Sequence, residues 1–178
     1  MLPDSTTTKI MKIFFYEPTK RHYLKEISRK ARIAHTSVMK ELNFLLKENL
    51  IKKHLEKRGS RNFPIYTADF RNPRHKTLKS INNLESMMFS GLIERIVEKT
   101  TPSCIILFGS YARGEDTEDS DIDLFIEGEQ EDLNLEDFEK NFKRKIDLHF
   151  NPDFKSYPKE LKNNIMNSIK IYGFLDGY

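Results

Sequence analysis

Apolar positions in the first third of the chain recur every three or four residues, which is the period of an amphipathic helix. The pattern predicts three helices, over residues 6–16, 23–31 and 36–49. Asp4 and Ser5 precede the first helix as N-cap residues, and Thr36 or His35 caps the third. The segment therefore favours a small helical bundle at the start of the chain.

Two shorter segments that follow are typical of β-strands, residues 51–56 and 63–67. A basic stretch that contains Gly59 separates them. Because a glycine-containing stretch between two strand segments is a turn signal, the two strands are predicted to form a hairpin with a basic tip.

Residues 72–79 are polar and basic and contain Pro73, which indicates a linker. An apolar stripe then recurs at helical spacing, and it predicts one long helix over residues 76–99. Gly91 weakens this helix near its middle.

The second half of the chain changes to strand periodicity. A continuous apolar run over residues 104–108 is typical of a buried strand, and residues 121–126 and 145–150 alternate between apolar and polar positions. Residues 132–143 are predicted to form a helix between the last two strands, and a final helix is predicted over residues 158–173. The order of strand, helix and strand favours parallel or mixed pairing through a crossover.

Three aspartates lie on these alternating strands. Asp121 and Asp123 share one strand face because side chains repeat every second residue. Asp147 faces the same way when its strand is laid beside the first. Neighbouring carboxylates repel each other unless a cation lies between them, and a few oxygen ligands that leave room for water and phosphate suit Mg²⁺.

Gly109 and Ser110 lie between the apolar run and a helix that is predicted to start near Tyr111. Exposed backbone N–H groups at a helix start bind phosphate. A nucleoside triphosphate with Mg²⁺ would satisfy both this turn and the aspartates.

The charge of the 178-residue chain is strongly divided. Residues 1–80 hold 19 Lys and Arg against 7 Asp and Glu, a net charge of +12, whereas the rest has a net charge of −9. The division suggests two domains with different partners. The single cysteine, Cys104, lies in an apolar run and is expected to be a buried thiol. Because no signal peptide and no membrane-spanning apolar run is found, a cytoplasmic protein without membrane association is expected.

The segment Gly109-Ser110-Tyr111-Ala112-Arg113-Gly114, followed after five residues by Ser120-Asp121-Ile122-Asp123-Leu124, resembles the signature of the minimal nucleotidyltransferases in the DNA-polymerase-β-like superfamily. Asp147 falls where that family carries its third carboxylate. The resemblance covers the chain from about residue 100 onward.

This resemblance implies a role for each matching residue. Asp121, Asp123 and Asp147 would be the catalytic metal ligands, and Asp147 would help to activate the attacking hydroxyl. The nucleotide-binding residues would be Gly109, Ser110, Arg113 and Ser120. The implied cofactors are two Mg²⁺ ions, and the substrate is ATP or another nucleoside triphosphate.

Residues 5–69 resemble the winged helix-turn-helix family in the order and length of their predicted elements. In that family the third helix enters the major groove and the hairpin is the wing. The residues predicted to contact nucleic acid are Ser37, Lys40, Asn43, Lys47, Lys57, Arg58 and Arg61. Two alternatives to nucleic-acid binding stay open: the charged helix face is only solvated, or the winged helix binds a protein.

The chain is thus predicted to be an α+β protein with a winged helix-turn-helix domain over residues 1–72, a connecting helix over residues 73–99 and an α/β nucleotidyltransferase domain with a small mixed sheet over residues 100–178. The expected activity is transfer of a nucleoside monophosphate to a protein or RNA acceptor. Minimal members of the family are often antitoxins that modify a helical HEPN-type toxin, so such a partner is one expectation, and a homodimer through the long helix is another. The alternative is a DNA-binding regulator whose C-terminal domain only binds nucleotide.

Overall fold

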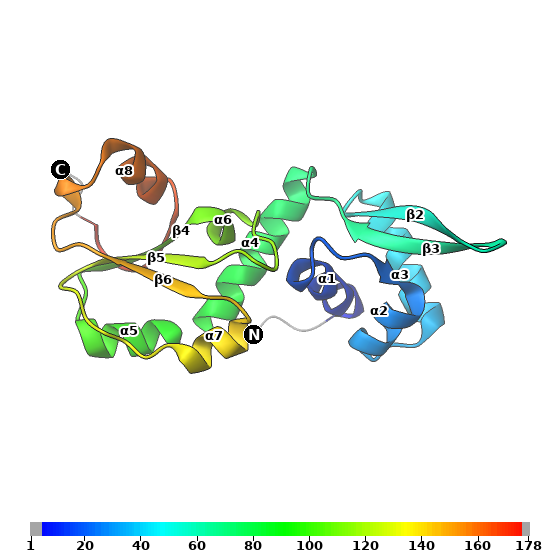
Figure 1. Cartoon of the computed structure of the whole chain (residues 1–178), viewed down its shortest axis with the longest axis horizontal. Coiled ribbons are helices and arrows are strands. Elements are labelled where there is room, and N and C mark those ends of the chain that lie inside the picture. The colour runs from blue at the N-terminus through cyan, green and yellow to red at the C-terminus, as the bar shows by residue number, and fades with distance from the viewer. Residues whose placement is uncertain (1–4, 176–178) are drawn as a thin grey trace. The chain divides into compact units, whose positions relative to one another are not determined.

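The computed structural model describes residues 5–175, and the chain divides into two compact units between Asn82 and Asn83. Each unit has its own sheet (Figure 1). Each also has its own buried core. This combination of helices and two small sheets confirms the predicted α+β class.

The described part of the N-terminal unit begins with three helices and a three-stranded sheet. Its elements are α1 (Thr6–Tyr16), β1 (His22–Tyr23), α2 (Leu24–Ala31), α3 (His35–Lys47), β2 (Ile51–Arg58) and β3 (Arg61–Ala68). The strands are antiparallel, in the order β1, β3, β2. The helices and the hairpin follow one another as the apolar pattern predicted.

The helix starts show which capping predictions were correct. The Ser5 hydroxyl accepts a hydrogen bond from the backbone N–H of Thr8 at 3.1 Å, so Ser5 caps α1. Asp4, the other predicted cap, lies outside the described residues. The predicted capping of the third helix by Thr36 or His35 is wrong, because α3 begins with His35 itself and the residue before it makes no side-chain capping bond.

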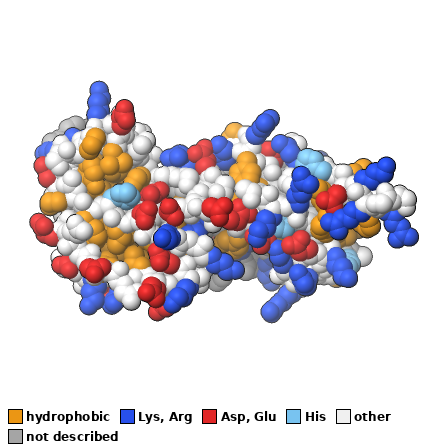
Figure 2. Space-filling model, viewed as in Figure 1, with side chains coloured by type: hydrophobic (Ala, Val, Ile, Leu, Met, Phe, Trp, Pro, Cys, Tyr) orange, Lys and Arg blue, Asp and Glu red, His pale blue; other side chains and the backbone are white. Residues whose placement is uncertain are grey.

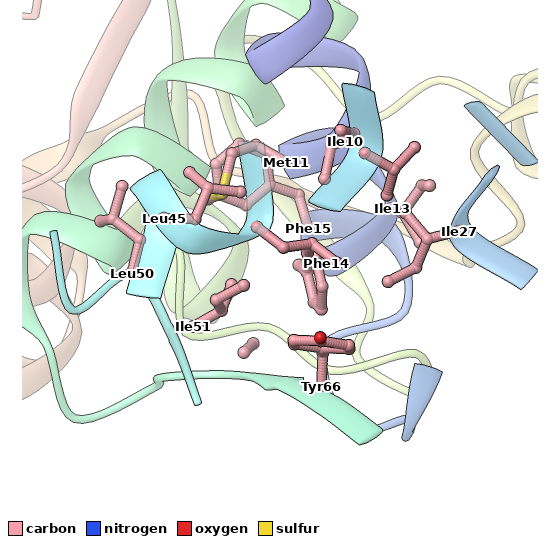
Figure 3. Packing of buried hydrophobic residues seen from close by; sticks show 13 residues of the cluster. Ile10, Met11, Ile13, Phe14, Phe15, Ile27, Leu45, Leu50, Ile51 and Tyr66 are labelled. Carbon is pink, nitrogen blue, oxygen red and sulfur yellow. The ribbon is translucent and has the colours of Figure 1, made fainter. Parts of the chain in front are cut away.

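The core of this unit lies where the helices meet the sheet (Figure 3). Ile10 and Phe14 of α1 are fully buried, as is Ile27 of α2, and Tyr66 of β3 packs against the same cluster. Burying one such side chain stabilises the fold by about 1.5–3 kcal/mol. The apolar stripes found in the sequence are therefore the faces that hold the three helices on the sheet.

The hairpin is longer than predicted, and a third strand accompanies it. β2 and β3 pair from Ile51 opposite Ala68 to Arg58 opposite Arg61. β1 pairs with β3 through two residues only and was not predicted. A two-residue strand is too short to show an alternating pattern.

The predicted linker over residues 72–79 is wrong, because α4 (Pro73–Met88) begins there. Proline suits the first position of a helix, where its missing N–H has no intrahelical partner in any case. The single long helix over residues 76–99 is also wrong. Gly91 has a left-handed backbone with a φ of 80° and separates α4 from α5 (Leu92–Thr100).

The C-terminal unit is built on a four-stranded mixed sheet. After α5 it contains β4 (Cys104–Phe108), α6 (Gly109–Arg113), β5 (Ile122–Glu127), α7 (Glu136–Phe142), β6 (Ile146–Phe150), the 3₁₀ helix η1 (Phe154–Ser156), α8 (Lys159–Met166) and β7 (Ile169–Gly173). The strand order is β6, β5, β4, β7. β5 and β6 are parallel and joined through α7, as predicted, whereas β4 is antiparallel to both of its neighbours.

Both faces of this sheet are covered, which explains the continuous apolar run of β4. Ile105 and Leu107 belong to the cluster that includes α5, and Ile106 and Phe108 belong to the cluster that includes α8. A strand buried on both faces needs no polar alternation. Cys104 is a buried free thiol, as predicted, and its burial raises its pKa to about 11.

The predicted final helix over residues 158–173 is partly wrong. α8 ends at Met166, and β7 then pairs antiparallel with β4. Ile169 and Ile171 are half-buried on the sheet and alternate with exposed neighbours. Among residues 5–175, no helix has the length and apolar composition that crossing a membrane requires.

Candidate active site

The parallel pairing of β5 with β6 places two of the predicted metal ligands side by side. Asp123 and Asp147 are register partners on these neighbouring strands. Adjacent strands lie about 4.8 Å apart, and partners in register point to the same face of a sheet. Asp121 lies directly before β5 and is exposed to solvent, as is Asp147. On the face of the C-terminal unit seen in Figure 2, acidic side chains gather beside a histidine.

Asp123 is the least exposed of the three aspartates, with 28% of its side chain accessible. Burial raises the pKa of its carboxyl above the ordinary value; His149 opposes this rise, and the negative charges of Asp147 and Asp121 add to it. A divalent cation would offset both the cost of burying the negative charge of Asp123 and its repulsion by the neighbouring carboxylates. Carboxylate oxygens are the ligands that Mg²⁺ prefers, so the chemistry of these three side chains suits that ion.

His149 lies beside this group, on the same strand as Asp147. Its Nε2 is 3.7 Å from Oδ1 of Asp123, too long for a hydrogen bond but close enough for an electrostatic interaction. The edge of its ring packs against Phe108, with 5.1 Å between ring centroids. The alternation of side chains along a strand places His149, two residues after Asp147, on the same face.

The turn from β4 into α6 presses against Asp123. Gly109 has a φ of 75°, and a Cβ atom at this position would lie 2.1 Å from Oδ2 of Asp123. Only glycine fits here, because both the left-handed backbone and the close approach exclude a side chain. The structure thus brings the predicted phosphate-binding turn directly to a predicted metal ligand.

Replacing Gly109 by alanine is expected to destabilise the protein by about 1–3 kcal/mol and to lower its activity, because the new methyl group displaces Asp123. Gly128 provides the matched control, since a Cβ there would make an ordinary contact of 3.6 Å with Pro102. Gly128→Ala should be neutral or slightly stabilising. Urea-induced unfolding of both variants measures the difference, and equal stabilities would show that the turn can move away from Asp123.

Two other predicted nucleotide-binding residues have partners within the protein. Nε of Arg113 donates a hydrogen bond to Glu115 at 2.9 Å, on the exposed side of α6. The Ser120 hydroxyl accepts a hydrogen bond from the backbone N–H of Thr117 at 2.9 Å. Ser120 therefore shapes the loop before Asp121, and its predicted contact with nucleotide stays a prediction, as does that of Arg113.

A buried polar network that the sequence did not indicate holds the same loop. Arg144 pairs with Asp116 at 2.8 Å, and only 7% and 1% of their side chains are exposed. Arg144 also donates to the backbone carbonyls of Thr117 and Ser120. Asn83 Nδ2 donates to Asp116 at 2.9 Å. Both charged residues lie in charged runs that predict solvent exposure, so no sequence signal reveals their burial.

The residues predicted to contact nucleic acid are all exposed. Ser37, Lys40, Asn43 and Lys47 lie on the outer face of α3, and Lys57, Arg58 and Arg61 lie near the hairpin tip. Figure 2 shows Lys and Arg side chains around this tip. Arg58 differs from the others, because it pairs with Glu56 at 2.5 Å and lies over the Tyr23 ring at 4.8 Å.

Part of the chain is similar to a known protein family. Residues 90–172 match the family model described as a nucleotidyltransferase domain. This range contains the Gly109 turn, the three aspartates and the strands that position them. A search of curated proteins found no match. The family match supports nucleotidyl transfer as the general activity of this part of the chain.

Proposed function

We propose that the protein transfers a nucleoside monophosphate, with ATP as the expected donor, to a hydroxyl group of a protein or RNA acceptor. The observation that carries this proposal is the register of Asp123 with Asp147, with the Gly109 backbone against Asp123. All three residues lie within the range that matches the nucleotidyltransferase domain model.

In this proposal the acceptor oxygen forms a bond to the α-phosphorus, the bond to the bridging oxygen of the β-phosphate breaks, and pyrophosphate leaves. Two Mg²⁺ ions, when bound, neutralise the phosphates and stabilise the entering and leaving oxygens. Asp121, Asp123 and Asp147 supply the oxygen ligands, and Asp147, which is exposed, accepts the proton of the acceptor hydroxyl. The backbone of Gly109 and Ser110 holds the triphosphate. Most of the catalysis is then positioning and charge neutralisation.

Label transfer from α-labelled nucleotide tests this activity. The purified protein is incubated with each α-labelled nucleoside triphosphate and Mg²⁺ in cell extract, in parallel with Asp121→Ala/Asp123→Ala. Label on a protein or RNA band that requires both carboxylates supports the proposal and identifies the acceptor, including a small helical toxin if one is present. Nucleotide binding without any label transfer would favour the regulator that only binds nucleotide.

We further propose that the N-terminal unit is a winged helix-turn-helix that binds nucleic acid. Three observations support this: the net charge of +12 over residues 1–80, the exposed polar side chains on α3, which also exposes Met39 and Phe44, and the basic tip of the hairpin. Contacts with phosphate would dominate the affinity and make it strongly dependent on salt. This unit could hold an RNA acceptor or place the protein on a promoter.

Lys57→Ala/Arg61→Ala is expected to reduce the slope of log affinity against log salt by about 2, because each residue neutralises one phosphate. Both side chains are exposed at the hairpin. The matched control, Arg95→Ala/Lys99→Ala, removes the same charges from exposed positions on α5. Fluorescence anisotropy with duplex DNA and with RNA, from about 50 to 200 mM salt, measures both slopes. An unchanged slope in the hairpin variant would exclude the wing from the contact.

A further inference from the structure

A second cluster of potential metal ligands lies in the N-terminal unit, separate from the three aspartates. It consists of Glu17 at the end of α1, His22 on β1 and Glu26 on α2, and one ligand atom from each lies within 4.8 Å of the other two. The carboxylates are 25% and 28% exposed, whereas the His22 side chain is fully buried. Solvent therefore reaches the cluster only from the side of the two glutamates.

The imidazole of His22 is held with one nitrogen facing the glutamates. Its Nε2 lies 3.3 Å from the backbone carbonyl of Glu17, and its ring packs edge-on against Phe14 with 5.3 Å between centroids. A bond to a carbonyl places a proton on Nε2, which leaves Nδ1 as the nitrogen through which this histidine would bind a metal ion. A backbone carbonyl that fixes the second nitrogen is also the usual support of a metal-binding histidine.

Nδ1 of His22 faces the two carboxylates. Nδ1 of His22 is 3.5 Å from Oε1 of Glu26 and 3.8 Å from Oε2 of Glu17. Within residues 5–175, this buried Nδ1 has no hydrogen-bond partner. Three electron-pair donors thus converge on one point, an arrangement that a cation stabilises.

A lysine ammonium already pairs with the two carboxylates. Nζ of Lys30 contacts Oε2 of Glu17 and lies 2.7 Å from Oε1 of Glu26, the same two oxygens that face His22. The Lys30 side chain is 30% exposed, so its long stem can move into solvent without breaking the core. The Lys30 ammonium makes no hydrogen bond with Nδ1 of His22. A metal ion would bind this nitrogen as well as the two carboxylates.

We propose that Glu17, His22 and Glu26 bind a divalent transition metal such as Zn²⁺ or Co²⁺, which displaces the ammonium of Lys30. One imidazole nitrogen with two carboxylate oxygens suits these ions better than Mg²⁺, which prefers oxygen ligands alone. Because the ligands come from α1, β1 and α2, the ion joins the three elements and stabilises the N-terminal unit when it binds. The site is independent of the proposed nucleotide transfer.

Co²⁺ titration of the full chain tests the site, because Co²⁺ bound by nitrogen and oxygen ligands in a tetrahedral site absorbs strongly in the visible range. The titration uses the Asp121→Ala/Asp123→Ala variant, which removes two of the three candidate catalytic metal ligands, and follows the absorption band and the thermal midpoint. We expect one equivalent of Co²⁺ to produce the band and raise the midpoint, and Zn²⁺ to abolish the band by competition.

Substitutions assign the ligands. Glu26→Gln is expected to weaken binding by at least about tenfold, because it removes a charged ligand from a partly exposed position without disturbing the core. Lys30→Met is expected to tighten binding by about tenfold, because it removes the ammonium that contacts both carboxylates, whereas Lys20 pairs only with the other oxygen of Glu17. His35→Ala, which removes an exposed histidine of the same unit, should change nothing. Three outcomes would overturn the proposal and identify the cluster as an ion-pair network. They are the absence of the band, a band that Glu26→Gln leaves unchanged, and a Lys30→Met variant that is only less stable.

Discussion

Asp123→Asn is expected to reduce nucleotide transfer by at least about 1,000-fold, which corresponds to about 4 kcal/mol of transition-state stabilisation. The amide has nearly the same shape as the carboxylate but loses the negative charge with which Asp123 and Asp147 together would bind metal. Because the substitution preserves the packing under Gly109, the loss should come from chemistry rather than from folding.

The same substitution should leave the protein slightly more stable in the absence of divalent metal. Burial raises the pKa of Asp123 above its value in the unfolded chain, so ionisation of this carboxyl destabilises the folded state. That destabilisation develops as the pH rises from the ordinary pKa of an aspartate through the raised one. The advantage of Asp123→Asn should therefore be present at pH 7 and disappear in acid.

Thermal unfolding with a chelator present, at pH 7 and at acidic pH, measures this effect alongside the transfer rate. Asp119→Asn is the matched control, because it removes one negative charge from an exposed position of the neighbouring loop. It should retain both activity and stability. Full turnover in Asp123→Asn would refute the assignment of the site, and a marked loss of stability would mean that the carboxylate supports the fold.

The elements that were predicted correctly are those in which the order of apolar and polar residues alone indicates which side chains are buried. β4 was predicted with its observed bounds because five consecutive apolar residues can be buried only on both faces of a sheet. β5 and β6 were predicted from alternation, and the same alternation placed Asp123 and Asp147 on one face. The candidate metal ligands could thus be found from local patterns.

The elements that were missed depend on contacts that a local pattern does not contain. The helical spacing of Ile165 and Ile169 predicts a helix that continues through β7, but pairing with β4 makes this segment a strand. The linker prediction relied on Pro73 and polar neighbours, whereas the position of that proline at a helix start and the burial of His75 favour α4. In both cases contacts with other parts of the chain determined the structure, against the local pattern.

The buried pair of Arg144 and Asp116 is also revealed only by the folded structure. Arg144→Met is expected to destabilise the protein by about 3–5 kcal/mol. The substitution removes the guanidinium that pairs with the buried carboxylate of Asp116, whose side chain is 1% exposed, and loss of one member of a buried ion pair has a cost of this size. Lys145→Met, the exposed neighbouring position, should cost little. Urea-induced unfolding of the two variants measures the difference.

A double variant separates stability from positioning. Asp116→Leu/Arg144→Met removes both charges, and because apolar replacements of a buried ion pair are often neutral or stabilising, it should recover most of the lost stability. It does not restore the hydrogen bonds from Arg144 to the carbonyls of Thr117 and Ser120, which hold the loop that leads into Asp121. Nucleotide transfer should therefore stay low in a protein that is again stable. If activity returns together with stability, the pair serves the fold alone and the loop positions Asp121 without it.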